Sequence, residues 1–247
     1  LENYISLGEV DPLRPKVDRV DWAFTLDENN EDPILKSKYL SEIYFSTDYE
    51  YSGRPTVPIL VDTKRGKIVS NDYNYLTLYL ETAWKKFHKK NAPDLYPESL
   101  RDDINKMNEI IFNDVNNGVY KAGFAQSQAA YEAAYDQLFY RLDWLEERLG
   151  KQKYLFGEQL TDSDIRLYTT LSRFDIAYYE KFKCNKKRIR DYKNLWRYTE
   201  ELYQIPAFKN NTNFTAIKTH YYLSGHLSGT DDEFRVLPKG PDLKIWD

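Results

Sequence analysis

The sequence predicts an α/β domain followed by an all-helical domain. Two observations support this fold class. Residues 1–90 alternate short β-type runs with helical periodicity, whereas from residue 98 to 247 the apolar residues recur almost only at helical spacing. Residues 91–97 separate the two patterns and are expected to be a linker. With 247 residues, 41% of them hydrophobic, the chain can bury a core in each domain.

The first domain is expected to begin with a strand and a short helix. Residues 4–7 form a short apolar run that ends at Gly8, which is typical of a strand. A polar, proline-bearing stretch follows and is expected to be a loop. Five residues then recur at helical spacing and predict a short helix: Leu35, Tyr39, Leu40, Ile43 and Tyr44.

A β-hairpin and a second helix are expected next. Residues 56–62 have the pattern of a buried strand with a proline near its start. Residues 63–67 are typical of a hairpin turn, and residues 68–70 of its return strand. Asn71 and Asp72 are then expected to cap a helix with an apolar, tyrosine-bearing face. Strands alternating with helices indicate an α/β layer.

The second domain is expected to consist of helices. Residues 126–149 predict a long helix that Gly150 would end in the left-handed conformation. A capping box is predicted at Thr161, because this threonine and Asp164 can each bind the backbone N–H of the other. The helix that follows, to about residue 179, is mostly apolar or aromatic and is expected to be the central buried helix.

Composition excludes several classes of function. Lys+Arg 35 against Asp+Glu 39 gives a net charge of -4, which argues against nucleic acid as a partner. One cysteine cannot form an internal disulfide, and with His 3 it is a poor supply of metal ligands, so no metal is expected. No apolar run approaches the roughly 20 residues of a membrane span, and no signal pattern opens the chain. We therefore expect a cytoplasmic protein without a membrane partner.

Several blocks of the second domain follow one another in a fixed order: residues 116–125 (NNGVYKAGFA), 160–170, 173–175, 182–185, 217–222 and 238–241. Together with the Val57-Pro58 strand start, they resemble the glutathionyl-hydroquinone reductases, or Xi-class (omega-like) glutathione transferases. The resemblance spans nearly the whole chain, although residues 223–232 depart from the family in spacing. It implies a thioredoxin-like, glutathione-binding first domain and an all-helical transferase domain. Family members are dimers, so a homodimer is expected.

By this resemblance, the protein removes glutathione from glutathionyl-hydroquinones with a thiol nucleophile, and a second glutathione, the co-substrate, reduces the mixed disulfide. Only a thiolate attacks, so a cysteine of lowered pKa is needed. The family carries it in a Cys-Pro-Trp-Ala segment that is not in this sequence, since residues 4–7 align with the second strand of the thioredoxin-like fold. Either such a segment precedes Leu1, or this member is a non-catalytic module that binds a protein partner or small ligand.

Cys184 is the only thiol in the sequence. Its basic neighbours, Lys183 and Lys186 among them, would favour a thiolate if the side chain were exposed. The resemblance nevertheless places Cys184 in the helical domain, remote from the glutathione site. A structural cysteine is therefore the preferred interpretation.

The resemblance assigns glutathione contacts to the first domain. Thr56-Val57-Pro58 has the form of a cis-proline strand start, whose backbone pairs with the cysteinyl part of glutathione. The alternative is an ordinary trans proline at a sheet edge. Arg54 would meet a glutathione carboxylate, and Trp22 would pack against the ligand unless it merely plugs the surface.

The γ-glutamyl pocket of the family, an acidic residue followed by serine, is Asp72-Tyr73 in this sequence. Asp72 keeps a carboxylate for the ligand's ammonium group, although it would serve equally as a helix cap. Tyr73 replaces a small hydroxyl residue with a bulky one, while helix N-terminal amides remain available to a carboxylate. Either glutathione or another low-molecular-weight thiol is compatible with this pair.

Three tyrosines, of 22 in the chain, match positions that carry the family's chemistry. Tyr120 falls on the proton donor and acceptor, and Tyr178 and Tyr221 fall on two tyrosines that face the thiol and the quinol ring. A phenol with a pKa of about 10 can donate to a thiolate or quinol oxygen and stay protonated near neutrality. Phe124 and Tyr222 are expected only to line the pocket.

Overall fold

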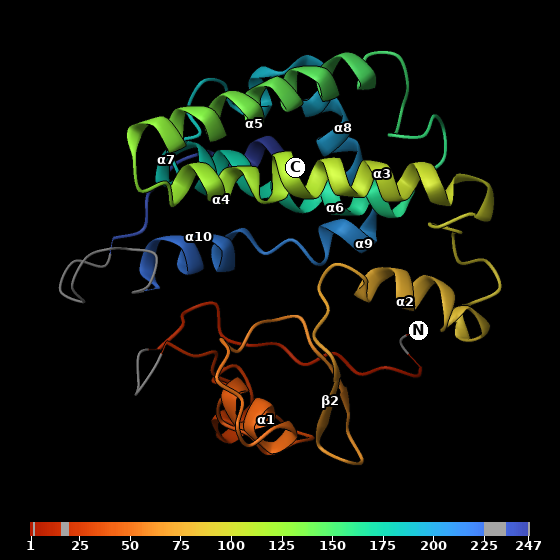
Figure 1. The fold of residues 1–247 in the computed structure, drawn as a ribbon, viewed down its shortest axis with the longest axis vertical. Helices are drawn as coiled ribbons and strands as arrows, with labels where there is room; N and C mark the ends of the chain where they lie inside the picture. The colour runs from red at the N-terminus through yellow and green to blue at the C-terminus, as the bar shows by residue number, and fades with distance from the viewer. Residues whose placement is uncertain (2, 16–19, 225–235, 247) are drawn as a thin grey trace. The chain divides into compact units, whose positions relative to one another are not determined.

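A computed structural model describes residues 1, 3–15, 20–224 and 236–246 (Figure 1). These residues form two compact units. The first comprises Leu1–Ala92 with Leu223–Val236, and the second comprises Pro93–Tyr222 with Leu237–Asp247. The division after Ala92 falls inside the expected linker. Of the segment 223–232 that departs from the family in spacing, all but Leu223 and Ser224 lies outside the described residues.

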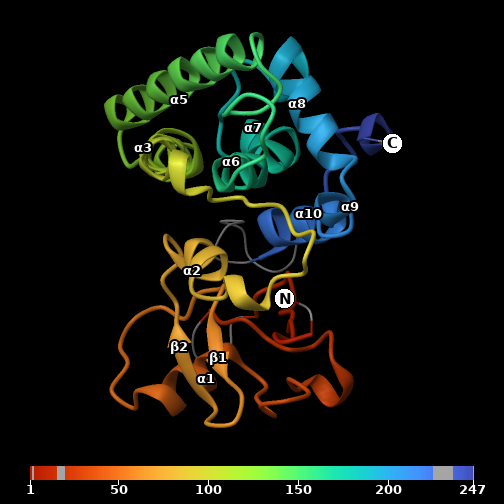
Figure 2. The ribbon, with the colours of Figure 1, turned by 90° about the vertical axis from the view of Figure 1, so that its right-hand side faces the viewer.

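The expected β-hairpin is present in the first unit, where β1 (Leu60–Asp62) pairs antiparallel with β2 (Lys67–Ser70) (Figure 2). Asp62 turns the chain, because its carboxylate accepts the N–H groups of the second and third residues after it. Gly66 closes the turn with a φ of 63°, in the left-handed region that glycine enters without a side-chain clash. Local turn chemistry therefore determines this hairpin.

The core of the first unit is small and partly aromatic. Helix α1 (Leu40–Thr47) packs against β2, and α2 (Leu76–Thr82) follows the hairpin. The fully buried residues are Phe24, Leu40, Ile43 and Tyr44, and half-buried Trp22 packs against them. The short helical turns η1 (Glu28–Asn30) and η2 (Lys85–Phe87) complete the unit.

Two expectations for the first unit are wrong. Residues 4–7 are not a strand: the N–H of Tyr4 bonds to the first residue in a turn, and these residues pair with no strand in the described chain. An apolar run becomes a strand only where another segment satisfies its backbone groups. Helix α2 begins at Leu76, because Asp72 heads a separate turn in which its carboxylate accepts the N–H two residues on, at 3.2 Å.

The second unit is helical, as expected. Its helices are α3 (Arg101–Ile111), α4 (Gly118–Gly123), α5 (Gln128–Leu149), α6 (Asp162–Arg173), α7 (Tyr179–Lys181), α8 (Lys193–Tyr203), α9 (Pro206–Lys209) and α10 (Phe214–Leu223). The π-helical turns η4 (Phe112–Asn116) and η5 (Phe174–Tyr178) continue α3 and α6, and the single 3-10 turns are η3 (Glu98–Leu100), η6 (Ile189–Asp191) and η7 (Leu243–Trp246). Helix α6 packs against α3 and α8, and α5 packs against α4 and α8 (Figures 1 and 2). Most of α6 is buried, which confirms its central place.

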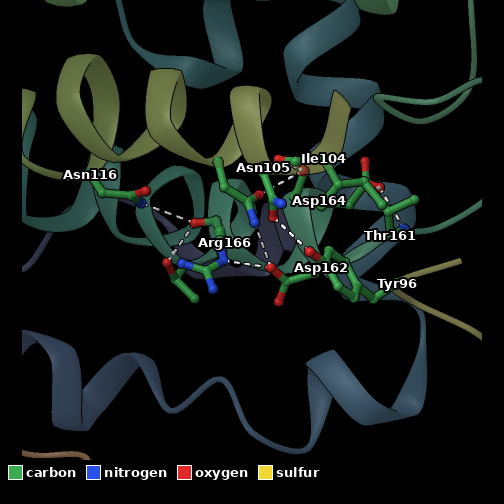
Figure 3. Close-up of polar contacts among 11 residues, drawn as sticks. Tyr96, Ile104, Asn105, Asn116, Thr161, Asp162, Asp164 and Arg166 are labelled. Atoms are coloured by element: carbon green, nitrogen blue, oxygen red, sulfur yellow. Dashed lines mark hydrogen bonds and ion pairs between the residues drawn. The ribbon is translucent and has the colours of Figure 1, made fainter. Parts of the chain in front are cut away.

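The predicted capping box starts α6. The Asp164 carboxylate accepts the backbone N–H and the hydroxyl of Thr161, both at 2.8 Å. Beside it, the Asp162 carboxylate accepts from the Arg166 guanidinium at 2.6 Å (Figure 3). The same carboxylate accepts from the Asn108 amide at 2.8 Å. Both carboxylates are almost fully buried, so these partners replace the water that each would otherwise bind.

Gly150 is not left-handed. Its φ is −69° and its ψ is −17°, which any residue adopts at a helix end. A Cβ on Gly150 would instead lie 2.9 Å from the side-chain nitrogen of Asn194, which donates to the Glu146 carboxylate at 3.1 Å. Glycine leaves room here for the close approach of the Asn194 side chain, which the local sequence does not reveal.

Candidate active site

Three tyrosines from separate helical segments of the second unit meet through their hydroxyl groups. Tyr120 lies in α4, Tyr178 ends η5 and Tyr221 lies in α10. The Tyr221 Oη atom lies 2.6 Å from that of Tyr120 and 2.7 Å from that of Tyr178. The Tyr120 and Tyr178 hydroxyls are 3.5 Å apart. The fold thus joins the three sequence-predicted residues into one group, which we call the phenol triad.

The members of the phenol triad differ in burial. Tyr178 is 3% exposed and Tyr221 is 4% exposed, whereas Tyr120 is half-buried. Burial, followed by the neighbouring phenols, raises the pKa of Tyr178 and of Tyr221 above the usual range, so both stay protonated at neutral pH.

Either oxygen can be the donor in each hydrogen bond of the triad. Each hydroxyl has one proton to donate and can also accept, so a negative charge on one oxygen can be stabilised by its neighbours. Tyr120 is the half-buried member, whereas Tyr178 and Tyr221 are buried.

A π-helical turn lies next to two of the triad residues. Turn η4 precedes Tyr120, and turn η5 contains Tyr178. In η4 the N–H of Asn117 bonds to the Phe112 oxygen at 2.8 Å, five residues back, and in η5 the N–H of Tyr179 bonds likewise to Phe174. A π turn holds an extra residue, so the side chains after it point in directions that a 3.6-residue period does not give. Helical periodicity alone therefore could not place Tyr178.

The residues matched to glutathione contacts all lie in the first unit: Trp22, Arg54, Thr56, Val57, Asp72 and Tyr73. The Val57–Pro58 peptide bond is cis, as expected. Val57 is 39% exposed, and the Tyr44 hydroxyl donates to the Thr56 carbonyl oxygen at 2.9 Å. The backbone before the proline is thus anchored to the core of the unit.

A buried arginine that sequence reasoning missed lies against Trp22. The guanidinium carbon of Arg14 is 4.7 Å from the centroid of the Trp22 ring, a cation–π contact. Burial, with the positive charge of Arg54, lowers the pKa of Arg14 to about 10, so the side chain remains charged at neutral pH. No motif marks Arg14, because this contact depends on two loop residues meeting in space.

The pair Asp72-Tyr73 follows β2 in a turn. Both side chains are exposed, Tyr73 by 52%. The Asp72 carboxylate accepts a backbone N–H of its own turn, as an Asx turn does. Its second oxygen leaves capacity for a further donor, so the turn role and a ligand role are compatible.

Cys184 is 0% exposed, and its thiol lies 3.7 Å from the Phe182 carbonyl oxygen, to which it donates. Burial raises the pKa of Cys184 to about 12. A thiol in this state is not ionised at neutral pH and is not a nucleophile. These properties support the structural interpretation of Cys184.

Cys184 is accordingly expected to resist iodoacetamide at pH 8 in the folded protein. Because its raised pKa keeps the thiol neutral, only about one molecule in 10⁴ would carry a thiolate at that pH. Peptide mass spectrometry after alkylation measures the modified fraction, with the protein in guanidinium chloride as the control that reacts fully. Rapid modification of Cys184 in the folded protein would contradict this assignment.

In the described part of the chain, no group of three or more His, Cys, Asp and Glu side chains is placed to hold a metal ion. No helix there combines the length and apolarity that crossing a membrane requires.

Comparisons with known proteins identify the family. Residues 128–201 match the family model "Glutathione S-transferase, C-terminal domain". Over 228 residues the chain is 42% identical to glutathionyl-hydroquinone reductase YqjG of Escherichia coli. The alignment covers 91% of this chain and 68% of that protein. The chain belongs to the glutathionyl-hydroquinone reductase family.

Solved structures agree with this membership and confirm the predicted fold class. A glutathione transferase from Gordonia bronchialis matches with a TM-score of 0.93 and 42% identity, over 99% of this chain and 74% of that one. The glutathione-bound structure of YqjG from Escherichia coli matches with a TM-score of 0.87 and 40% identity, over 97% of this chain and 76% of that one. The reductase therefore has a thioredoxin-like N-terminal domain and a helical glutathione-transferase domain.

Proposed function

We propose that this reductase removes glutathione from glutathionyl-hydroquinones or related aryl thioethers and uses a second glutathione as the reductant. Membership of a family whose relatives are named glutathionyl-hydroquinone reductases supports the reaction class. The observation that carries it in this chain is the phenol triad, because three converging hydroxyl groups suit a reaction that releases a hydroquinone.

The reaction balances with one cysteine, the glutathionyl thioether of the substrate and one glutathione thiol. A cysteine thiolate attacks the sulfur of the thioether, an enzyme–glutathione disulfide forms, and the aryl carbon–sulfur bond breaks. The aryl carbon gains a proton, and the hydroquinone leaves. A second glutathione then attacks the mixed disulfide, which releases oxidised glutathione and restores the thiolate. Since Cys184 is buried and protonated, the proposal places the nucleophile on a cysteine upstream of Leu1, as the family resemblance implies.

The phenol triad has two tasks in this scheme. Tyr178 and Tyr221 stay protonated near neutrality and can donate hydrogen bonds within the triad. A hydrogen bond from the Tyr221 hydroxyl, 2.6 Å away, would stabilise a negative charge on the Tyr120 oxygen, so Tyr120 could give up a proton and take it back. We assign proton transfer to Tyr120, and charge stabilisation to Tyr178 and Tyr221.

Glutathione binding is assigned to the six residues of the first unit. Val57 would pair its backbone with the cysteinyl part beside Thr56, Arg54 would meet a carboxylate, and Trp22 would pack against the ligand. Asp72 would accept from the ammonium group. Tyr73 replaces the family's serine, so this position would determine whether glutathione or another low-molecular-weight thiol binds.

We also propose that the enzyme acts in the cytoplasm as a homodimer. The second half-reaction consumes reduced glutathione, which favours the cytoplasm, where thiols are kept reduced. The family resemblance implies a homodimer, which sedimentation velocity of the purified protein would test.

The direct test is an assay of the full-length protein with the hydroquinone form of a menadione–glutathione conjugate and with glutathione. We expect one menadiol and one oxidised glutathione for each conjugate consumed. An intact-mass measurement on the same sample establishes whether a cysteine precedes Leu1. No turnover by a protein that contains that cysteine would refute the proposal. Turnover with another thiol but not with glutathione would refute the assignment of the reductant.

A further inference from the structure

Phe182, which the proposed reaction does not use, contacts every ring of the phenol triad. Its ring centroid lies 5.2 Å from that of Tyr120, 5.3 Å from Tyr178 and 5.8 Å from Tyr221. Phe124 is a further neighbour at 5.2 Å. Phe182 is 2% exposed, so the triad packs around one buried ring.

Gly123, the last residue of α4, makes room for that ring. A Cβ built on Gly123 would lie 2.5 Å from Cγ, 2.7 Å from Cδ2 and 2.9 Å from Cβ of Phe182. These atoms are the base of the side chain and not a flexible end, so an added methyl group could be accommodated only by moving the Phe182 ring. Because Phe182 is enclosed by the triad, the tyrosine rings would have to move with it.

The backbone gives Phe182 little freedom to move away. The carbonyl oxygen of Tyr178 accepts the N–H of Phe182 at 3.2 Å and the N–H of Cys184 at 3.1 Å. The Tyr131 hydroxyl donates to the Lys183 carbonyl oxygen at 2.7 Å. Hydrogen bonds therefore hold the turn that carries Phe182 on both sides, and some of them are made by Tyr178, a residue of the triad.

We propose that Gly123 and Phe182 are positioning residues, whose close contact sets the distances among the three triad hydroxyls. This inference rests on the proposed catalytic role of the triad. The triad's hydrogen bonds are short, 2.6 and 2.7 Å, and displacing a ring by about 1 Å breaks a bond of this kind. The absence of a side chain at residue 123 is thus required for proton transfer rather than only for packing.

The test uses Gly123→Ala in the full-length enzyme, with Gly118→Ala as the matched control. Gly118 begins the same helix, and a Cβ there would meet Leu138 at an ordinary 3.5 Å. Gly123→Ala is expected to lower kcat on the order of 10- to 100-fold, with the KM for glutathione within about twofold of the wild-type value. Gly118→Ala is expected to retain the wild-type kcat.

Two further measurements connect the effect to Phe182. A crystal structure of Gly123→Ala should show the Tyr120–Tyr221 oxygen distance lengthened beyond hydrogen-bonding range. In a double-mutant cycle, Gly123→Ala added to Phe182→Ala should cause little further loss, because the Cγ and Cδ2 atoms that lie nearest the added methyl group are then absent.

A wild-type kcat in Gly123→Ala, an equal loss in Gly118→Ala, an unchanged triad in the crystal structure or additive effects in the cycle would each overturn the inference. If the wild-type enzyme itself has no activity, the proposed function fails. The crystal structure of the variant would then still test the packing contact.

Discussion

Replacing Tyr120 with phenylalanine is expected to lower kcat for glutathionyl-hydroquinone reduction by about 10²- to 10⁴-fold, the range for loss of a general acid–base group. The substitution removes one oxygen and keeps the ring, which stacks near Phe124 with centroids 6.0 Å apart. It removes the 2.6 Å hydrogen bond between Tyr120 and Tyr221 and keeps the 2.7 Å bond between Tyr178 and Tyr221. Steady-state kinetics with the menadione–glutathione conjugate measure the loss.

The matched control for Tyr120→Phe is Tyr168→Phe. Tyr168 is a buried tyrosine of α6, and its hydroxyl forms a hydrogen bond with Thr212 Oγ1 at 2.9 Å, outside the triad. The kcat of the Tyr168→Phe enzyme is expected to stay within about twofold of the wild-type value. Equal losses in both variants would mean that buried tyrosine hydroxyls serve only stability, and a Tyr120→Phe enzyme with normal kcat would remove Tyr120 from the mechanism.

Replacing Asp164 with alanine is expected to lower the free energy of unfolding by about 3–5 kcal/mol, the cost of a lost helix cap plus several stranded donors. The carboxylate binds Thr161 twice and also accepts the Leu155 N–H and the Tyr198 hydroxyl, each at 2.9 Å. Asp164 and Tyr198 are both 0% exposed. Alanine would therefore leave the Leu155 and Thr161 donors buried without this acceptor, and the Tyr198 hydroxyl with only the backbone oxygen of residue 164 at 3.5 Å.

Denaturant titration followed by far-ultraviolet circular dichroism measures this change, since most helices lie in the second unit. Asp191→Ala is the matched control, because Asp191 occupies the same third helical position in η6 but is exposed and pairs with Arg188 at 2.7 Å. An exposed pair of this kind is worth about 1 kcal/mol or less. Equal losses for the two aspartates would show that burial adds nothing at Asp164.

Interactions between near neighbours in the sequence were predictable. The capping box needs only Thr161 and Asp164, three residues apart, and the hairpin depends on Asp62 and Gly66 within one turn. The burial of Cys184 agrees with its expected structural role. In the capping box and the hairpin the partners are neighbours along the chain, whereas the role of Cys184 followed from the family resemblance.

Interactions between distant segments were not predictable. Residues 4–7 have the composition of a strand but no paired neighbour among the described residues. Gly150 lies at a helix end, where glycine is common, but its lack of a side chain leaves room for Asn194. Arg14 and Phe182 carry no motif, although they touch Trp22 and the phenol triad. Such contacts depend on side chains that meet only after folding.

The sequence by itself determined the two-part fold, the family resemblance and the identities of Tyr120, Tyr178 and Tyr221, because these depend on periodicity and on matched residue types. The tertiary structure alone decided that the three hydroxyls lie within 2.6 to 3.5 Å of one another. The physical reason is that 101 positions separate Tyr120 from Tyr221. Two π turns and one buried ring, that of Phe182, also lie at the triad, and none of these features can be predicted from local sequence pattern.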